Sequence, residues 1–287
     1  MSGFLKRKLD DIEMKVKEED EGLEETEELK PLAVNATNNN AAVRIKCPYL
    51  DTINKQVIDF DSEKLCGVTL NNMNVYCCLV CGKFFQGRGK STPAYTHSVQ
   101  CAHFVFMNLQ SARTYCLPDG YEVHDSSLDL IVKSLIPKFT LKETLALNSN
   151  SSLSRDVYGI AYLPGFIGLN NLNATDYLNV LLHALAHVTP FRDFWLETEN
   201  YSLSKSNIVH HFGSVMRKMW SSNNFKSTVS PQELMQEINI ESKKLFSISS
   251  RSVCMDLLIW LLGKLHKGID GSNKNMSKSV IYEPFQV

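Results

Sequence analysis

The sequence lacks the two features that would direct the chain to a membrane. No run approaches the roughly 18 to 20 consecutive apolar residues that a spanning helix needs. The N-terminus, MSGFLKRKLDDIEMKVKEED, lacks the apolar core of a signal peptide. We therefore expect an intracellular protein with no membrane partner.

The sequence also lacks a surplus of charge of either sign. Its 30 basic and 31 acidic residues give a formal net charge of −1, and the two signs are equally frequent between residues 44 and 130. Binding to a phosphate backbone requires an excess of Lys and Arg. We expect no direct nucleic-acid site, and we favour a protein partner.

Globular character begins only after the first 43 residues. That stretch contains the acidic run EEDEGLEETEEL and the polar run NATNNNAA, neither of which can bury enough apolar surface to offset chain entropy. We predict a disordered acidic tail at 1–43. The remaining length and the 44% hydrophobic content suit about two domains.

The remainder reads as an α+β fold in two parts. Residues 44–130 carry short β-type runs at 75–80 and 103–107, separated by glycine turns, which predicts a small α+β module. Residues 131–155 are predicted to be a connector with helical character and a polar, Ser/Asn-rich middle. Residues 156–287 are predicted to be mostly helical, with helices after Asp176, near 208–219 and at 252–266. The first of these has a leucine face at i, i+3, i+4 and i+7, formed by Leu178, Leu181, Leu182 and Leu185.

Cysteine is concentrated in the first module, where seven of the eight cysteines lie between residues 47 and 116. In a reducing compartment, clustered Cys beside His favours a metal site over a disulfide framework. The spacing Cys78-x2-Cys81-x15-His97-x5-His103 supplies four ligands for a tetrahedral structural zinc. With all four ligands from protein, such an ion contributes to folding and not to catalysis.

Other cysteines leave alternatives open. They could replace a ligand, or Cys47 and Cys66 could form a second site, although no second histidine pair accompanies them. They could equally be buried small apolar residues. The alternatives concern Cys47, Cys66, Cys77, Cys101 and Cys116.

The motifs CLVCGKFFQGRG, AYTHSVQCAHFVFMNL and YCLPDGYEV resemble the zinc finger of ubiquitin-specific proteases. The wider stretch of about residues 44–285 is similar to the inactive ubiquitin-specific proteases of the spliceosome, the tri-snRNP-associated family. The resemblance implies a UBP-type finger at 44–145. It also implies a partial, papain-like but inactive protease domain at 146–287, shortened at its C-terminal side.

In fingers of this type that bind ubiquitin, an Arg of the glycine turn and nearby aromatics hold the C-terminal Gly-Gly of ubiquitin. The resemblance places these roles on Arg88 and Tyr115, and a guanidinium suits a terminal carboxylate. Leu117 stands where a second aromatic is expected, so the pocket is incomplete. Arg88 could also be an ordinary turn residue, and Tyr115 a packed strand aromatic.

The family's catalytic motif GLxNLGNTCYMN aligns with residues 168–179, which places Asp176 at the nucleophile and Ala174 at the oxyanion-binding Asn. A carboxylate is a poor nucleophile toward an amide, and losing one oxyanion donor costs about 10²–10³ in rate. Asp is also a good N-cap, so we expect it to keep the helix start. We therefore predict no catalytic residue and no enzyme activity.

Protease domains of the family need a His and an Asp or Asn much further along than Val287, so we expect this chain to lack the catalytic base. Four histidines are present on the predicted helices, where we expect surface or interface positions: His183, His187, His210 and His211. We expect a set of apolar residues on the last helix to face chain that the shortened domain lacks, and so to form an exposed patch: Leu257, Leu258, Trp260, Leu261 and Leu262.

The resemblance favours a nuclear, non-catalytic adaptor in pre-mRNA splicing that supports assembly or recruitment of the tri-snRNP through protein contacts. Two alternatives belong to other classes. One is a ubiquitin reader that uses the finger alone, and the other is a working cysteine deubiquitinase.

Overall fold

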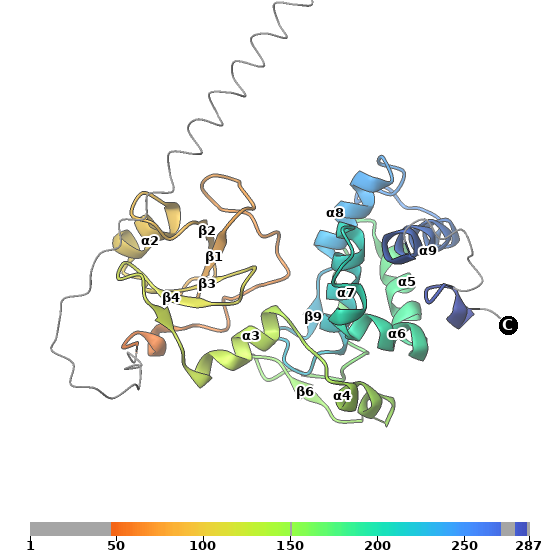
Figure 1. Ribbon diagram of the computed structural model, residues 1–287, viewed down its shortest axis with the longest axis horizontal. Helices are drawn as coiled ribbons and strands as arrows, with labels where there is room; N and C mark the ends of the chain where they lie inside the picture. Colours follow the sequence, from red (N-terminus) through yellow and green to blue (C-terminus); the bar gives the residue numbers. More distant parts are fainter. Residues whose placement is uncertain (1–46, 150, 271–278, 286–287) are drawn as a thin grey trace, which may run out of the picture. The chain divides into compact units, whose positions relative to one another are not determined.

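A computed structural model describes residues 47–149, 151–270 and 279–285, which belong to one compact unit (Figure 1). The predicted acidic tail at 1–43 lies outside the described residues. Within the described ranges, every helix is too short or too polar to span a bilayer.

A five-stranded antiparallel sheet organises the first part, in the order β2–β1–β3–β4–β5. Its strands are β1 (Val75–Cys78), β2 (Phe84–Gln86), β3 (Val105–Asn108), β4 (Thr114–Cys116) and β5 (Glu122–Val123). The runs predicted at 75–80 and 103–107 are present as β1 and β3. Every residue of both strands is buried. Alternate side chains of β1 enter two different clusters, with Val75 and Cys77 on one face and Tyr76 and Cys78 on the other.

Helix α2 (Pro93–Cys101) contacts the edge strand β2 of this sheet. Pro93 suits the first helical position, because its missing N–H has no partner in the first turn. The helix ends at Ala102, whose φ of 54° is left-handed and turns the chain back toward β3.

A connector follows the sheet and contains α3 (Asp129–Leu135) and α4 (Leu141–Ala146). Thr140 and Glu143 form a reciprocal capping box that fixes the start of α4. The connector packs on both cores of the molecule. Val132 and Ile136 contact the core on the side of the sheet, whereas Phe139 contacts the helical core.

The second part is mostly helical, as predicted. Its helices are α5 (Asp176–Ala186), α6 (Thr189–Leu196), α7 (Asn207–Trp220), α8 (Gln232–Glu241) and α9 (Cys254–Asp270). Two-residue strands form two small sheets, with β6 (Ser154–Arg155) antiparallel to β7 (Ala161–Tyr162) and β8 (Gly168–Leu169) parallel to β9 (Thr228–Val229). The face of α7 that carries Val209, Phe212, Met216 and Met219 is fully buried.

The apolar residues of α9 correct one prediction. Leu257, Leu261 and Leu262 are buried in the helical core and do not form an exposed patch. Trp260 is partly buried and packs on Phe246, with ring centroids 5.6 Å apart. The periodicity marks a buried face correctly, but the neighbouring elements α5 and α7 already cover it.

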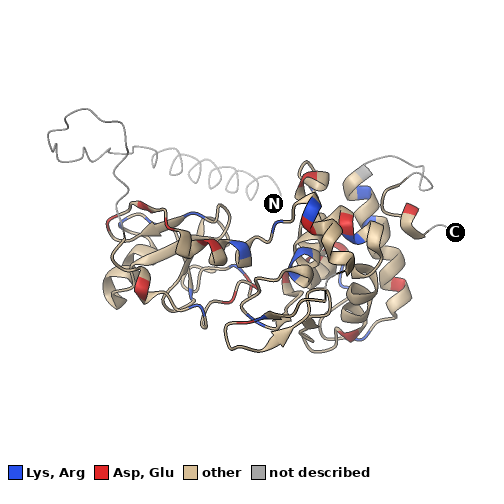
Figure 2. Cartoon of the chain, turned by 90° about the horizontal axis from the view of Figure 1, so that it is seen from below, with Lys and Arg blue, Asp and Glu red and all other residues tan. Residues whose placement is uncertain are grey.

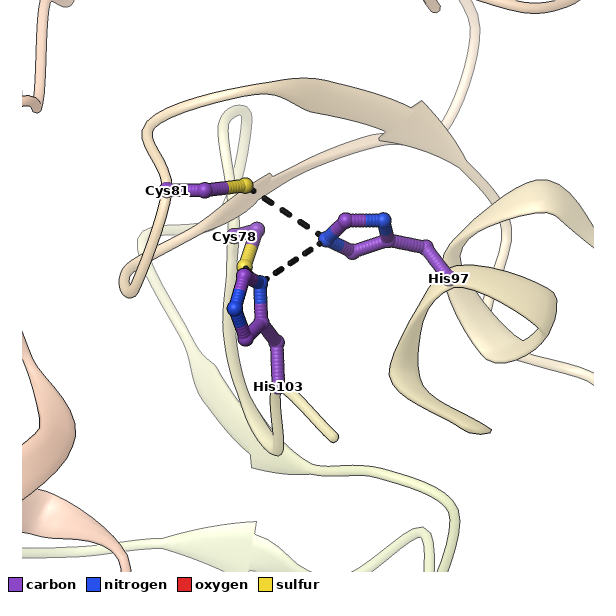
Figure 3. A group of neighbouring side chains, drawn as sticks. All are labelled: Cys78, Cys81, His97 and His103. Carbon is purple, nitrogen blue, oxygen red and sulfur yellow. Dashed lines mark hydrogen bonds between the residues drawn. The ribbon is translucent and has the colours of Figure 1, made fainter. Parts of the chain in front are cut away.

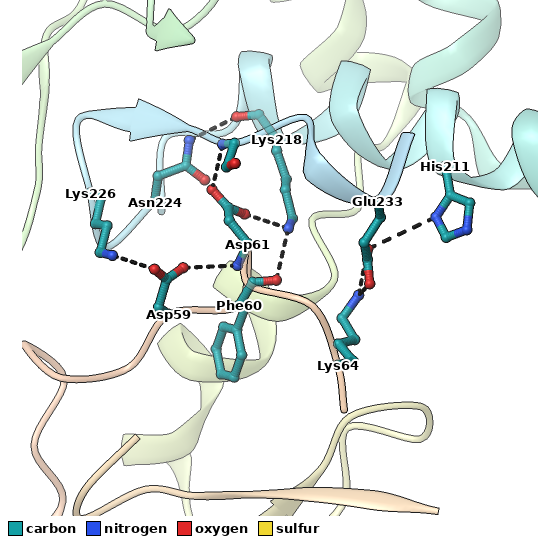
Figure 4. A network of polar contacts seen from close by, with 10 residues as sticks. Asp59, Phe60, Asp61, Lys64, His211, Lys218, Asn224, Lys226 and Glu233 are labelled. Atoms are coloured by element: carbon teal, nitrogen blue, oxygen red, sulfur yellow. Dashed lines mark hydrogen bonds and ion pairs between the residues drawn. The ribbon is translucent and has the colours of Figure 1, made fainter. Parts of the chain in front are cut away.

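A polar network joins the segment before the sheet to the helical part (Figure 4). The Lys218 ammonium, on α7, forms an ion pair with Asp61 and donates to the Phe60 carbonyl at 3.2 Å. The Ser230 N–H donates to the second carboxylate oxygen of Asp61 at 3.0 Å. The Lys218 side chain is only 7% exposed, so the pair is shielded from water.

Two further ion pairs flank this buried pair. Lys226 contacts Asp59, and Lys64 contacts Glu233 at 2.9 Å. Although burial opposes it, the hydrogen bond from Lys226 contributes to lowering the pKa of Asp59. Both flanking pairs are more exposed than the Lys218–Asp61 pair, and exposed pairs add little to stability.

Candidate metal centre and degenerate catalytic position

The four predicted zinc ligands converge from three places in the finger (Figure 3). Cys78 ends β1, and Cys81 lies in the turn that follows. His97 projects from α2, and His103 follows that helix just before β3. Their ligand atoms all lie within 4.8 Å of one another, and this is the one such cluster among the described residues.

The distances fit a tetrahedral zinc ion. Zn–S bonds of about 2.3 Å and Zn–N bonds of about 2.0 Å give edges between ligand atoms of about 3.3 to 3.8 Å. The observed edges are 3.5 Å from Cys78 Sγ to His103 Nδ1 and 3.4 Å from Cys81 Sγ to His97 Nε2. The two ring nitrogens are 3.1 Å apart. The four side chains therefore fit one ion, with no position left for water.

The protonation states also suit a metal. Burial raises the pKa of the Cys78 thiol to about 12, so the thiolate needs a cation beside it. Burial, together with the neighbouring His103, lowers the pKa of His97 and favours the neutral imidazole that binds metal. His97 also stacks on Phe85 at 4.2 Å between centroids, which fixes the orientation of its ring.

Gly82 makes the ligand turn possible, and we predict that Gly82→Ala will destabilise the finger. Its φ is +75°, and an added Cβ would lie 2.1 Å from the Val57 carbonyl oxygen. We expect a loss of at least about 2–3 kcal/mol in the free energy of unfolding, together with a lower zinc content.

Gly120→Ala is the matched control for this prediction. Its φ is +81°, but nothing lies within 4 Å of the added Cβ. Strain alone should cost about 1 kcal/mol there. Urea unfolding of both variants measures the difference, and equal losses would contradict the role of the Val57 contact.

The other cysteines of the module have separate environments. Cys66 Sγ accepts hydrogen bonds from the N–H groups of Val68 and Thr69. Burial raises the pKa of Cys116 to about 11, and Cys47 and Tyr121 are its hydrogen-bonding neighbours. Cys47 and Cys66 thus have different partners, and no second cluster of three or more ligands occurs in the described ranges.

The two residues assigned to ubiquitin recognition lie together. The Arg88 guanidinium carbon is 4.4 Å from the centroid of the Tyr115 ring, and its Nη1 donates to the Gly120 carbonyl. Arg88 is exposed and Tyr115 is half-buried. Leu117 is fully buried in the sheet core, so its side chain is not part of a surface pocket.

Asp176 begins α5, and its position corrects the capping prediction. The N-cap is Thr175, and Asp176 is the first helical residue, exposed to solvent. Sequence reasoning missed Asn171, whose Oδ1 accepts from the Thr175 N–H at 3.0 Å and from its hydroxyl at 3.2 Å. Asn171 therefore holds the turn that presents Asp176, and no sequence pattern distinguishes it from the neighbouring Asn170 and Asn173.

The neighbouring Ala174 is tied to the helical part through its backbone. Its N–H donates to the Ile248 carbonyl at 3.1 Å, and its side chain offers no donor. The expected positions of the histidines agree with the structure, since His187 and His210 are exposed and His183 and His211 are half-buried. Basic and acidic residues are interspersed over strands and helices (Figure 2). The absence of a nucleic-acid site stays a prediction.

Two protein families match the chain, one over each part. Residues 64–128 match the family described as Zn-finger in ubiquitin-hydrolases and other protein, and residues 167–287 match ubiquitin carboxyl-terminal hydrolase. The four candidate ligands lie in the first match and Asp176 in the second. The class is thus a ubiquitin-hydrolase-type zinc finger joined to a ubiquitin carboxyl-terminal hydrolase-type domain.

Comparison with individual proteins shows which members of this class the chain is similar to. The chain is 47% identical over 247 residues to human ubiquitin carboxyl-terminal hydrolase 39, covering 84% of this chain and 44% of the human protein. It is 42% identical over 240 residues to the probable mRNA-splicing protein ubp10 of Schizosaccharomyces pombe, covering 83% of this chain and 47% of that protein. A crystal structure of an essential yeast splicing factor matches with a TM-score of 0.71 and 30% identity, over 77% of this chain and 55% of that one.

The chain spans about half the length of the curated relatives that it matches. Over the matched regions it is similar to ubiquitin carboxyl-terminal hydrolase-like proteins, and some of these relatives carry names that describe them as splicing proteins.

Proposed function

We propose that this chain is a non-catalytic splicing factor that acts in the nucleus through protein contacts with the tri-snRNP. Its finger holds one structural zinc ion on Cys78, Cys81, His97 and His103. Its hydrolase-type domain provides contact surfaces and performs no cleavage. The proposal extends to this chain the splicing role that the names of its relatives carry.

One observation carries the non-catalytic part of the proposal. Asp176 occupies the first turn of α5, where the family places a cysteine nucleophile. The positive end of a helix activates a thiol by favouring its anion. A carboxylate at the same place is already anionic, but it does not form a productive acyl intermediate with an amide. The Ala174 N–H, already bonded to Ile248, offers no replacement for the missing oxyanion donor.

Affinity purification from nuclear extract tests the splicing role. The tagged full chain should enrich the small nuclear RNAs of the tri-snRNP over a tag-only control, measured by quantitative reverse transcription. If these RNAs are not enriched, the splicing assignment fails, whatever the state of the catalytic position.

We predict that neither the native chain nor Asp176→Cys will turn over a fluorogenic ubiquitin substrate. The substitution restores a thiol but leaves Ala174, and one missing oxyanion donor alone costs about 10²–10³ in rate. Turnover by the native chain that disappears in Asp176→Asn would overturn the non-catalytic proposal.

Ubiquitin recognition by the finger is a second candidate function, and the stacking of Arg88 on Tyr115 favours it. Titration of the labelled full chain with ubiquitin should then show binding that Arg88→Ala removes. The matched control is Lys90→Ala, an exposed cation two residues away. Ubiquitin that ends before its Gly-Gly should not bind, and equal binding by both forms would exclude this use of Arg88.

A further inference from the structure

A groove of about 570 Å³ lies where the two cores of the molecule meet. One wall carries Ala112, Val132 and Ile136, which pack against the core on the side of the sheet. The opposite wall carries Phe139, Leu147 and Trp220, which belong to or pack against the helical core. Neither the zinc ligands nor Asp176 lines this groove.

The segment that forms most of the groove lies between the two matched family regions. The first match ends at residue 128 and the second begins at 167, whereas the connector contributes residues 132–147 to the lining. The groove is therefore a product of joining the finger to the hydrolase-type domain, and neither part forms it alone.

The groove is preformed. The Trp220 indole N–H donates to the Ala186 carbonyl at 3.2 Å, and the Arg192 guanidinium lies 4.6 Å from the centroid of its ring. Trp220 is only 5% exposed, and these two contacts hold its ring in place. A rigid apolar wall reduces the entropy lost when a partner side chain enters.

The rim of the groove is basic. Lys133 and Lys138 are exposed, and neither has an ion pair within the described part of the chain. Glu143 also lines the groove. Its carboxylate accepts from the Thr140 N–H at 2.8 Å and hydroxyl at 2.7 Å and interacts with the charge of Lys133, so two cations and one anion leave the rim net positive. A net positive rim beside a half-buried apolar floor complements an acidic segment with apolar side chains.

We propose that this groove binds a segment of a protein partner in which aromatic or aliphatic anchors stand beside acidic residues. Its volume falls in the range of about 300–1,000 Å³ typical of binding pockets, enough for the anchors of a short peptide. Two lysines are too few to hold a nucleic-acid backbone, because strong phosphate binding needs several contacts.

Fluorescence anisotropy with a synthetic peptide tests this proposal on the purified full chain. The probe is a short fluorescein-labelled peptide with Trp and Leu anchors flanked by Asp and Glu. Two comparison peptides replace the acidic residues with Lys or the anchors with Ser. We expect saturable binding of the probe alone.

Charge reversal at the rim tests the role of the lysines. The double variant Lys133→Glu, Lys138→Glu should weaken probe binding by about tenfold or more. Lys142→Glu makes the same kind of charge change at an exposed position of α4 that does not line the groove, and it should stay within about twofold. If Lys142→Glu weakens probe binding equally, the effect comes from the net charge of the chain and not from the rim, and the proposal is overturned.

A second pair of variants tests the apolar wall. Phe139→Ser should abolish probe binding, whereas Leu145→Ser, at an exposed position outside the groove, should not. Zinc content and thermal melting show that both variants remain folded.

Three outcomes would overturn the proposal. They are no probe binding at millimolar concentration, equal binding of the Lys-bearing or Ser-bearing peptide, and a dimer of the chain that the rim variant dissociates. Because this measurement contains no nuclear extract, it can succeed or fail independently of the splicing assignment.

Discussion

Removal of zinc is expected to lower the melting temperature of the chain by more than about 10 °C. Structural zinc ions contribute about 10–16 kcal/mol of apparent binding free energy in isolated fingers. This finger also has an apolar core, so part of its stability remains without metal. If only about 5 kcal/mol is lost, the shift for a domain of this size is still about 10–20 °C.

Stability is lost because the four ligand side chains stay close together after the ion is removed. Without an ion, two thiols and two imidazoles converge with 3.1 to 3.5 Å between their ligand atoms. Cys78 is fully buried and lies in the smaller cluster of the sheet with Phe85 and Phe106. The proposed ion would join the turn from Cys78 to Cys81 to the residue just before β3, so on its removal the sheet should lose its order around β1 and β3.

Cys81→Ser and Cys101→Ser provide the matched test. Cys81 is a candidate ligand, whereas Cys101 is an exposed cysteine at the end of α2. We expect about one zinc per native chain by mass spectrometry of the metal, the same for Cys101→Ser, and much less for Cys81→Ser. A Cys81→Ser variant that keeps both its zinc and its melting temperature would exclude this ligand set.

The ligand cluster was accessible to sequence reasoning because its information is local. Cys78 and Cys81 share one turn, and the later histidines follow at a spacing that a short helix can close. The long helices were accessible for a similar reason. The region predicted at 208–219 is α7, and the region predicted at 252–266 is α9, which extends to Asp270.

The N-cap of α5 could not be predicted from the local sequence. Thr175 and Asp176 are both good capping residues, so composition alone cannot decide between them. In the structure Thr175 occupies the N-cap position without a side-chain capping bond, donates to Asn171 Oδ1, and leaves Asp176 as the first helical residue. The decision thus depends on a turn whose geometry the sequence pattern does not specify.

The sequence could not predict the long-range polar contacts. Lys218 and Asp61 are 157 positions apart, and no periodic pattern relates them. The two-residue strands β6 to β9 give no periodicity either, because two residues are too few to alternate. The groove between the two cores is lined by residues from Ser111 to Asn223 that no local pattern relates, so it could be found only after the fold was known.

Replacing Lys218 with methionine is expected to cost about 3–5 kcal/mol in the free energy of unfolding. The substitution keeps the length of the side chain but removes the charge that pairs with Asp61. Breaking a buried ion pair on one side leaves the other charge without compensation, which is the costly case. Asp61, whose side chain is 17% exposed, would retain the Ser230 N–H as a partner but lose the ammonium.

Lys226→Met is the matched control, since it breaks the neighbouring pair with Asp59. Those side chains are 40% and 34% exposed, so we expect a loss of no more than about 1 kcal/mol. Urea unfolding followed by circular dichroism measures both variants. Equal losses would show that burial of the Lys218–Asp61 pair does not determine its contribution.

A double variant separates the pair from its surroundings. Asp61→Asn together with Lys218→Met removes both charges, so the penalty of an isolated buried charge disappears. We expect the double variant to be more stable than Lys218→Met alone, by about 1–3 kcal/mol. If the losses of the two single variants simply add, the two groups are not coupled. The connection between the 58–64 segment and α7 would then depend on apolar packing, with Phe225 in contact with Phe60 at 6.4 Å between ring centroids.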